Sequence, residues 1–183
     1  MEALLHPISL EDGREARVRF LRSDEGHLLI DLFQRLSPES RYQRFHVPVG
    51  ELTPEEIRER LPRYTDVDGW DHVALLAVLQ EAGREEALAV ARYKRTAEQQ
   101  VAEAAVVVRD DWQRQGIGTE LLVQLMAVAR QRGVDRFEAW VQGSNRSILR
   151  LIAALPQRHQ VRAERGETYI VLYLDEPPPP PAA

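Results

Sequence analysis

The sequence predicts an α/β domain with a mixed sheet, from the order of its elements and from one strand-to-helix connection. A strand, two or three helices, three strands, a helix, a strand, a helix and a hairpin follow one another along the chain. The β-branched run 106–108 leads through a polar turn into Gly116-Ile117-Gly118 and a long amphipathic helix. That helix is predicted to cross between two parallel strands, which places the glycine turn at the carboxyl end of a strand, where such sheets bind ligands.

The N-terminal half is predicted to begin with a flexible leader over residues 1–13 and to continue with a domain over 14–175. Alternating apolar residues from Glu15 to Leu21 indicate a strand, and Ser23 is predicted to cap the helix that follows. Further elements are expected as a short helix from Ser37 to Phe45, a helix opened by the capping box at Thr53 and ending near Leu61, and strands over 70–79, 87–95 and 101–108, the first two joined by a turn at Gly83.

The C-terminal half continues with a helix over 117–132 that ends at Gly133 and a strand over 137–141. Apolar residues at helical spacing then predict a helix that Pro156 stops, and a hairpin around Val161 and 168–174 closes the domain. Residues 176–183 contain five consecutive prolines and form an extended tail outside the core. The tail is either a solvated terminus or a ligand for a proline-recognising partner.

Length and composition exclude several functional classes. The 183 residues suffice for one full-sized core, and the net charge of −5 argues against nucleic acid as a partner. The absence of cysteine excludes disulfides, thiolate catalysis and cysteine zinc sites, and the five histidines lack metal-ligand spacing, so no metal is expected. Neither a membrane span nor a signal peptide is recognisable. The cytoplasm is therefore the expected location, and no membrane partner is expected.

The Gly-x-Gly turn has the chemistry of an anion site. Orphan N–H groups from Gln115 through Thr119 and the helix dipole point at whatever binds there. The turn is not a P-loop, because no Gly-Lys-Ser/Thr follows, and it lacks the third glycine of a dinucleotide fingerprint.

Three blocks resemble the GNAT N-acetyltransferase superfamily. They are the spacing Gln-x-x-Gly-x-Gly over 113–118, the run 144–151 in which Asn145 opens a helix, and the run Leu36-Ser37-Pro38-Glu39-Ser40-Arg41-Tyr42-Gln43-Arg44-Phe45. The last block and the run 103–113 look like the bacterial Pat-type protein-lysine acetyltransferases. The resemblance covers residues 14–174. It implies a GNAT fold: a mostly antiparallel sheet whose parallel central pair is splayed to admit acyl-CoA, with helices on both faces.

The resemblance implies acetyl-CoA as cosubstrate and a protein lysine as acceptor, as on acyl-CoA synthetases. Asn145 could bond the cofactor or only cap its helix. Arg41 and Tyr42 could line the acceptor groove or be ordinary surface residues. The residues that would hold the cofactor by this resemblance are Val106, Val107, Val108, Gln113, Arg114, Gln115, Gly116, Ile117, Gly118, Thr119 and Asn145.

Glu103 is the leading candidate for the general base that an amine acceptor requires. It lies among apolar residues on a strand expected to be largely buried, where desolvation would raise its pKa, and it matches the catalytic glutamate of lysine-acetylating GNAT proteins. A solvent-facing glutamate at a strand end is the alternative, and Glu138 on the next strand is the reserve base. The family's usual tyrosine acid is replaced by Ile152, and its usual Gly-Phe by Pro156-Gln157.

Three functions remain open at this point. The first is acetylation of protein lysines, which the run 37–45 and Glu103 favour. The second is acetylation of a small amine, and the third is an acyl-CoA-binding regulatory module without catalysis, which Ile152 and Pro156 favour.

Overall fold

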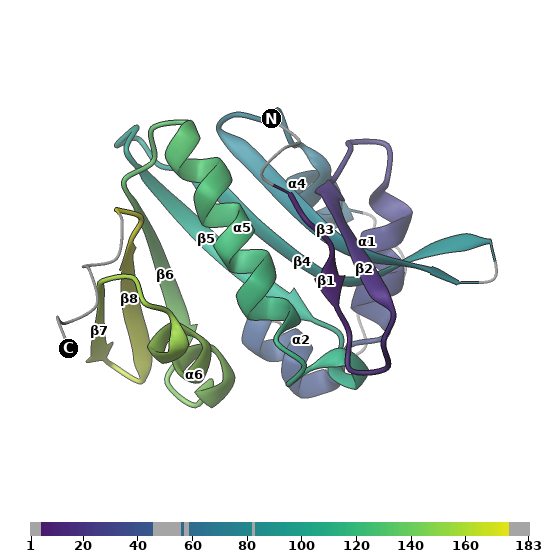
Figure 1. Ribbon diagram of the computed structural model, residues 1–183. Helices are drawn as coiled ribbons and strands as arrows, with labels where there is room; N and C mark the ends of the chain where they lie inside the picture. The colour runs from purple at the N-terminus through teal and green to yellow at the C-terminus, as the bar shows by residue number, and fades with distance from the viewer. Residues whose placement is uncertain (1–4, 46–55, 57–58, 82, 176–183) are drawn as a thin grey trace, which may run out of the picture.

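The computed structural model describes residues 5–45, 56, 59–81 and 83–175 (Figure 1). Within them, an eight-stranded sheet runs in the order β1-β2-β3-β4-β5-β6-β8-β7. The strands are β1 Ile8–Ser9, β2 Glu15–Phe20, β3 His72–Glu81, β4 Arg84–Arg95, β5 Val101–Val108, β6 Arg136–Gln142, β7 His159–Glu164 and β8 Glu167–Tyr173.

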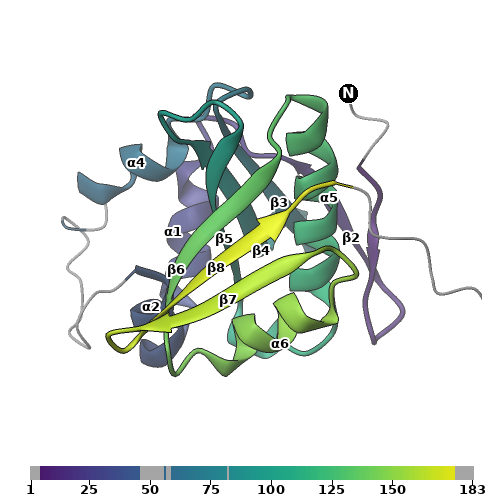
Figure 2. The same ribbon diagram turned by 90° about the vertical axis from the view of Figure 1, so that its left-hand side faces the viewer.

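Helices cover the two faces of the sheet. Helices α5 Ile117–Gln131 and α6 Arg146–Ala154 lie on one face, whereas α1 Gly26–Gln34, α2 Pro38–Phe45 and α4 Pro62–Thr65 lie on the other (Figures 1 and 2). The expected mixed α/β architecture with helices on both faces is therefore confirmed. No helix in the described part of the chain is long and apolar enough to span a membrane.

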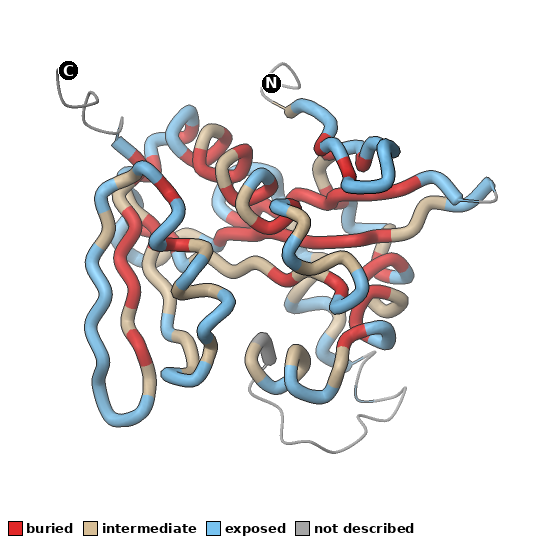
Figure 3. Tube along the Cα trace, turned by 60° about the horizontal axis from the view of Figure 1, so that its bottom comes forward, coloured by how far each residue is buried: buried red, intermediate tan, exposed pale blue. Residues whose placement is uncertain are grey.

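Strand β3 shows why the sheet separates two hydrophobic cores. Its residues His72 to Leu79 are all buried, so the strand lacks the usual alternation of buried and exposed positions (Figure 3). Val73 and Leu75 pack into the core that contains α5, whereas Leu76 and Val78 pack into the core that contains α1. The sheet beneath the site is thus fixed from both sides.

The sheet is antiparallel throughout its described pairs except between β5 and β6, as predicted. The parallel register pairs Val101 with Arg136 and ends where Glu103 pairs with Glu138. Beyond that point β5 continues to Val108 beside β4, and β6 continues to Gln142 beside β8. The two central strands therefore share only their first residues and part afterwards.

The predicted hairpins form, with turns that their glycines explain. Gly83 has φ 79° in the turn between β3 and β4, and Gly166 has φ 87° in the turn between β7 and β8. Both glycines have left-handed backbone, which costs glycine little. Strand β7 is the outer strand of the sheet and is mostly exposed, as Figure 3 shows.

Two local expectations from the N-terminal half are wrong. The leader over 1–13 was expected to be flexible, yet Ile8–Ser9 pairs with β2, and Ile8 and Leu10 are buried in the core that contains α5. Besides these two apolar side chains, the Gln124 side chain holds the segment by hydrogen bonds with the His6 N–H at 3.1 Å and the His6 carbonyl at 3.0 Å. Ser23 does not cap α1, because the helix begins at Gly26 with Glu25 at its N-cap.

Two other expectations fall on residues outside the described part. The capping box at Thr53 and the proline tail over 176–183 both lie there. Of the helix predicted to follow Thr53, residues 56, 59 and 60 are described and are helical.

Candidate active site

The Gly-x-Gly loop, residues 113–119, joins β5 to α5 through two left-handed residues. Arg114 has φ 65° and Gly116 has φ 80°, and α5 begins directly afterwards. A non-glycine residue such as Arg114 rarely adopts this conformation. The N–H of Glu120 donates to the Gly116 carbonyl at 3.0 Å, and this is the first turn of the helix. The three preceding N–H groups therefore have no carbonyl within the helix and face the end of α5.

The two glycines of this loop are required for different reasons. A side chain at Gly116 would meet no atom within 4 Å, so its left-handed backbone is the restriction. A Cβ at Gly118 would lie 3.2 Å from Val108 and 3.3 Å from Leu151, so α5 could not sit as close to β5 and α6. Gly118 therefore keeps room for the close packing of α5 against β5 and α6.

The parted edge of β5 continues the site from this loop. Val106 and Val108 pack against the core that contains α5, and Val107 is buried in the core that contains α1. Their side chains thus belong to the two cores, while their backbone lies beside the opening between β5 and β6. An open strand edge followed by a helix N-terminus with unpaired N–H groups fits an elongated ligand whose amide-containing arm leads to a pyrophosphate, as in an acyl-CoA.

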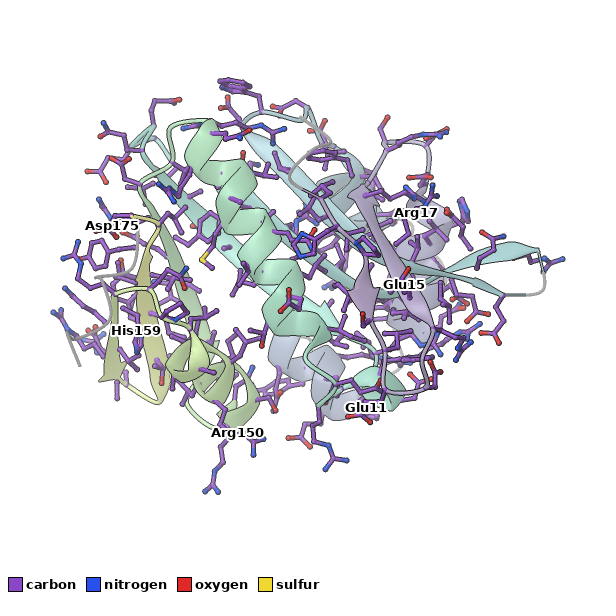
Figure 4. The ribbon with its side chains drawn as sticks, viewed as in Figure 1. Glu11, Glu15, Arg17, Arg150, His159 and Asp175 are labelled. Atoms are coloured by element: carbon purple, nitrogen blue, oxygen red, sulfur yellow. The ribbon has the colours of Figure 1, made fainter. Side chains whose placement is uncertain are left out.

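One cavity of about 760 Å³ joins these features. Glu103 and nearly all the predicted cofactor-binding residues line it, from the β5 valines through the Gly-x-Gly loop to Asn145. Among the predicted cofactor-binding residues Gln115 is the exception, and its side-chain oxygen accepts a hydrogen bond from the Glu11 N–H at 3.4 Å. Figure 4 shows Glu11 beside the start of α5. The cavity is lined by residues from both sides of the opening between β5 and β6.

Helix α6 contributes a face that the sequence reasoning missed. Ser147, Arg150, Leu151 and Ala154 line the cavity at helical spacing, and Arg150 projects from the helix in Figure 4. Asn145 caps α6, since its side-chain oxygen accepts the Ile148 N–H at 3.2 Å. Ile152, at the position of the family's usual tyrosine, is buried in the core. Because isoleucine has no ionisable group, this position cannot supply an acid. The spacing 147, 150, 151 and 154 was the available signal.

Glu103 is placed differently from our expectation. It was expected to be desolvated on a buried strand, but it is exposed at the wall of the cavity. Its sequence neighbours Val101 and Ala102 are buried and Ala104 is half-buried, but the burial of these apolar residues does not extend to Glu103. Glu103 lies on the face away from α5, at the last residue before β5 and β6 part.

Glu138, the reserve base, lies directly across from Glu103 on β6 and also lines the cavity. Arg136 donates to its carboxylate at 2.9 Å. Burial and a hydrogen bond to Glu138 raise the pKa of Tyr169 to about 12, so this phenol stays protonated. Glu138 is therefore occupied by two neighbours, which favours Glu103 as the group available to an acceptor.

A polar wall, defined as Ser40, Gln43, Arg63, Tyr64, His72, Arg92 and Lys94, closes the cavity on the face of α2 and α4. Arg92 is 8% exposed and contacts the His72 ring, and its guanidinium lies 4.9 Å from the centre of the Tyr64 ring. Burial and the neighbouring Arg92 lower the pKa of His72, so the ring is neutral at pH 7. Of this wall, we had singled out only the run containing Ser40 and Gln43. The alternation of Arg92 and Lys94 at the end of an apolar strand was the available signal.

The two predicted substrate residues on α2 do not line the cavity in the described structure. Arg41 donates to the carbonyls of Phe33 at 3.2 Å and Gln34 at 2.8 Å, so it caps the end of α1. Tyr42 is 39% exposed and lies on the surface. The helix instead turns Ser40 and Gln43 toward the cavity, three residues apart on one face.

Asp110 holds α2 against the Gly-x-Gly loop. Its carboxylate accepts hydrogen bonds from the Ser37 N–H at 2.8 Å, the Ser37 hydroxyl at 2.7 Å and the Ser40 hydroxyl at 2.8 Å. Gln113 donates to the Val108 carbonyl at 3.1 Å and to the Ser40 hydroxyl at 3.4 Å. The start of α2 and the start of the loop are thus one hydrogen-bonded unit.

A buried arginine, Arg109, stabilises the connection between β5 and the Gly-x-Gly loop. Arg109 pairs with Asp111 at 2.6 Å and with Glu86 at 3.0 Å, and Glu86 also pairs with Arg35 at 2.9 Å. Its hydrogen bonds lower the pKa of Asp111 and of Glu86. These ion pairs join α1, β4 and the end of β5 ahead of the loop.

Comparison with known proteins identifies the family. The profile of the acetyltransferase (GNAT) family matches residues 32–155. The chain belongs to the GNAT acetyltransferase family. An acetyltransferase of Pseudomonas aeruginosa, PA5475, is 31% identical over 147 residues, which are 80% of this chain and 77% of that protein. This GNAT chain is accordingly an acyltransferase enzyme, and its family performs acyl transfer from acetyl-CoA.

Solved structures of acetyltransferases and acyltransferases share this fold. The GNAT domain of S. lividans PAT is 29% identical with a TM-score of 0.78, covering 94% of this chain and 98% of that domain. A cAMP-binding acyltransferase from Mycobacterium smegmatis is 25% identical with a TM-score of 0.59, and this chain covers about half of it. The yncA structure from Salmonella typhimurium, with its cofactor acetyl-CoA, shares the fold at 20% identity, a TM-score of 0.63, and coverage of 91% and 97%.

Proposed function

We propose that this GNAT enzyme transfers an acetyl group from acetyl-CoA to the side-chain amine of a lysine on another protein. One observation carries the proposal: Glu103 faces the cavity at the residue where β5 and β6 part, and the Gly-x-Gly loop lines the same cavity. This arrangement supports the proposal, since a carboxylate that could serve as the base and a loop that could bind an anion line the same cavity.

The cofactor would be held mainly by backbone. The N–H groups of Ile117, Gly118 and Thr119 would bind its pyrophosphate, and Arg114 and Arg150 at the cavity edge supply positive charge. The β5 edge at Val106 and Val108 would bind the amides of its pantetheine arm. Acetyl-CoA, when bound, supplies an activated acetyl group as a thioester.

Glu103 would act on the acceptor. A lysine has a pKa of roughly 10.4, so only about one side chain in 2,500 is neutral at pH 7. The Glu103 carboxylate would accept the proton from the ammonium, directly or through a water molecule, and leave an amine able to attack. Because Glu103 is exposed at the wall of the cavity, the acceptor can be positioned directly beside it.

The resemblance of residues 36–45 and 103–113 to Pat-type enzymes, and the similarity to the S. lividans PAT domain, support a protein acceptor. The polar wall would form one side of the acceptor groove, with Ser40 and Gln43 contributed by α2. A small amine would meet the same base and the same cofactor site, so it is the competing acceptor class.

The experiment is acetyl-CoA turnover with two kinds of acceptor, followed by mass spectrometry. The enzyme would be incubated with acetyl-CoA and a host lysate, and in parallel with free polyamines and amino sugars. We expect acetyl-lysine at defined sites of folded proteins and thiol release that depends on them. Efficient turnover of a small amine, without protein sites above background, would decide for that class. A melting shift with acetyl-CoA but no thiol release would indicate a binding module.

A further inference from the structure

The sequence contains a single lysine, and the fold places it in the cavity. Of the 24 lysine and arginine residues, only Lys94 is a lysine. It lies near the end of β4, it is exposed, and it lines the same cavity as Glu103 and the Gly-x-Gly loop. Lys94 is therefore the one side chain of this sequence with the amine group that the enzyme is proposed to acetylate.

Lys94 belongs to a row of four side chains that crosses four strands. The register pairs His72 with Lys94, Lys94 with Glu103, and Glu103 with Glu138. Residues directly paired across neighbouring strands project from the same face, with Cβ atoms about 4.5–5.5 Å apart. Lys94 and Glu103 are therefore immediate neighbours on the face that looks into the cavity.

The ammonium of Lys94 is not committed elsewhere. No hydrogen bond or ion pair among the described residues holds it, whereas Arg92 two residues earlier is buried against His72. A lysine side chain is a flexible four-carbon stem, so its nitrogen can move over Glu103 toward the opening between β5 and β6.

We propose that Lys94 is a self-acetylation site of this enzyme, acetylated by the cofactor bound in its own cavity. Glu103 accepts one proton from the Lys94 ammonium, and the freed nitrogen attacks the carbonyl carbon of the thioester. The N–C bond forms and the C–S bond breaks. A second nitrogen proton goes to the departing sulfur to give the thiol, and the proton on Glu103 passes to solvent.

The product is an uncharged amide beside Glu103. Arginine cannot take the place of lysine in this reaction, because its guanidinium is not deprotonated in proteins. Lys94 is the one side-chain amine in the sequence, so peptide mapping identifies acetylation at this residue directly. The inference rests on the proposed function, since it uses the same base and the same cofactor site.

The test is intact-mass and peptide mass spectrometry of the purified full chain incubated with acetyl-CoA alone. We expect one acetyl group, mapped to Lys94, and a rate per molecule that does not change on dilution. Lys94→Arg keeps the charge and the stem and should abolish this modification. Glu103→Gln should slow it by about 10²–10⁴-fold, the usual effect of losing a general base.

A relocated lysine provides the matched control. Arg84 is exposed at the far end of the same strand, so Arg84→Lys in the Lys94→Arg background offers a lysine outside the cavity. That lysine should be acetylated at least about 100-fold more slowly than Lys94 if the reaction requires the base. Equal rates at both positions would mean spontaneous acetylation and would overturn the proposal.

Two further outcomes separate this inference from the proposed function. Turnover of external acceptors without modification of Lys94 would overturn the self-acetylation alone. A melting shift with acetyl-CoA, but neither turnover nor self-acetylation, would overturn both. A rate that rises with enzyme concentration would show transfer between molecules and would contradict the intramolecular reaction.

Discussion

The two sides of the cavity are built in different ways. The proposed cofactor side is mainly one continuous stretch, from the β5 valines through the Gly-x-Gly loop to α5, and its backbone is left-handed at Arg114 and Gly116. The polar wall opposite comes from α2, α4, β3 and β4, with residues as far apart as Ser40 and Lys94. The proposed cofactor side thus comes mainly from one segment of the sequence. The polar wall consists of residues from distant segments that the packing of helices and strands brings together.

This difference indicates what each side can recognise. A helix N-terminus and a strand edge present the same N–H and carbonyl groups whatever the side chains are, so the cofactor side suits a ligand common to the family. The polar wall consists of side chains, and its shape depends on how α2 and α4 pack. Asp110 joins the two sides, because it follows β5 and holds the start of α2.

The largest expected effect separates the base from the ligand-binding surfaces. Glu103→Gln should lower turnover by about 10²–10⁴-fold while the melting shift with acetyl-CoA is retained. Glu138→Gln is the matched control and should cost less, because Arg136 and Tyr169 already engage that carboxylate. Steady-state kinetics over pH 6–9 would measure both. A larger loss in the Glu138 variant would assign the base to Glu138.

The second prediction concerns a variant, Gly116→Val, that affects only the proposed cofactor side of the cavity. Acetyl-CoA at about 100 times its dissociation constant should stabilise the native protein by roughly 2.7 kcal/mol. Gly116→Val should remove this gain, because a β-branched residue disfavours the backbone with φ 80° that aims the loop.

Gly133 supplies the control for backbone strain. It has φ 77° at the other end of α5, and a side chain there would also meet no atom within 4 Å. Gly133→Val should destabilise the fold by a similar ~1–3 kcal/mol and keep the acetyl-CoA shift. Thermal melts with and without acetyl-CoA distinguish the two variants. A retained shift in the Gly116 variant would remove this loop from the binding site.

The third prediction concerns a variant that weakens the contact between the proposed cofactor side and the polar wall. Asp110→Ala leaves the Ser37 N–H and two hydroxyls without their acceptor, so we expect a loss of about 0.5–2 kcal/mol, as for a helix cap. The KM for the acceptor should rise while the acetyl-CoA shift stays. Glu39→Ala in the same helix, bonded only locally to Gln43, is the control. Equal effects on cofactor and acceptor would mean that the two sides are not separable in this way.

The smallest expected effect is a pH dependence of stability beneath the loop. Arg109 lowers the pKa of Asp111 and of Glu86 in the folded protein, so folding favours their ionised forms. Their contribution is fully present above the unfolded values near pH 4 and is lost as the pH falls through the lowered folded values. Denaturant unfolding of the protein and of Asp111→Asn between about pH 6 and 3 would measure it. An unchanged acid dependence in the variant would contradict this role for the ion pair.

Much of the fold could be predicted because its signals are local. Glycine turns, the apolar spacing of α5 and the alternation of β2 depend on neighbours within a few residues, and these elements form where expected. The Gly-x-Gly loop belongs to the same class, since a strand, a turn and a helix start are all encoded in one run. The segment Ile8–Leu10 was missed because two residues give no periodicity, although β2 pairs with them.

The candidate site was predicted only as far as it is contiguous. Glu103 was found, but its exposure was not, because the parting of β5 and β6 uncovers a residue that its own strand neighbours suggest is buried. Arg41 and Tyr42 were chosen from the right helix but the wrong face, since the orientation of α2 is set by Asp110, about 70 residues away in the chain.

The sequence by itself determined the order of elements, the Gly-x-Gly turn, and the positions of Glu103 and Lys94 near strand ends. The tertiary structure decided that Glu103 and Lys94 are neighbours across β4 and β5, and that Arg92 and His72 share a wall with α2. The physical reason is that strand register and helix packing are set by burial across the whole sheet. Such contacts join residues that no local pattern can relate.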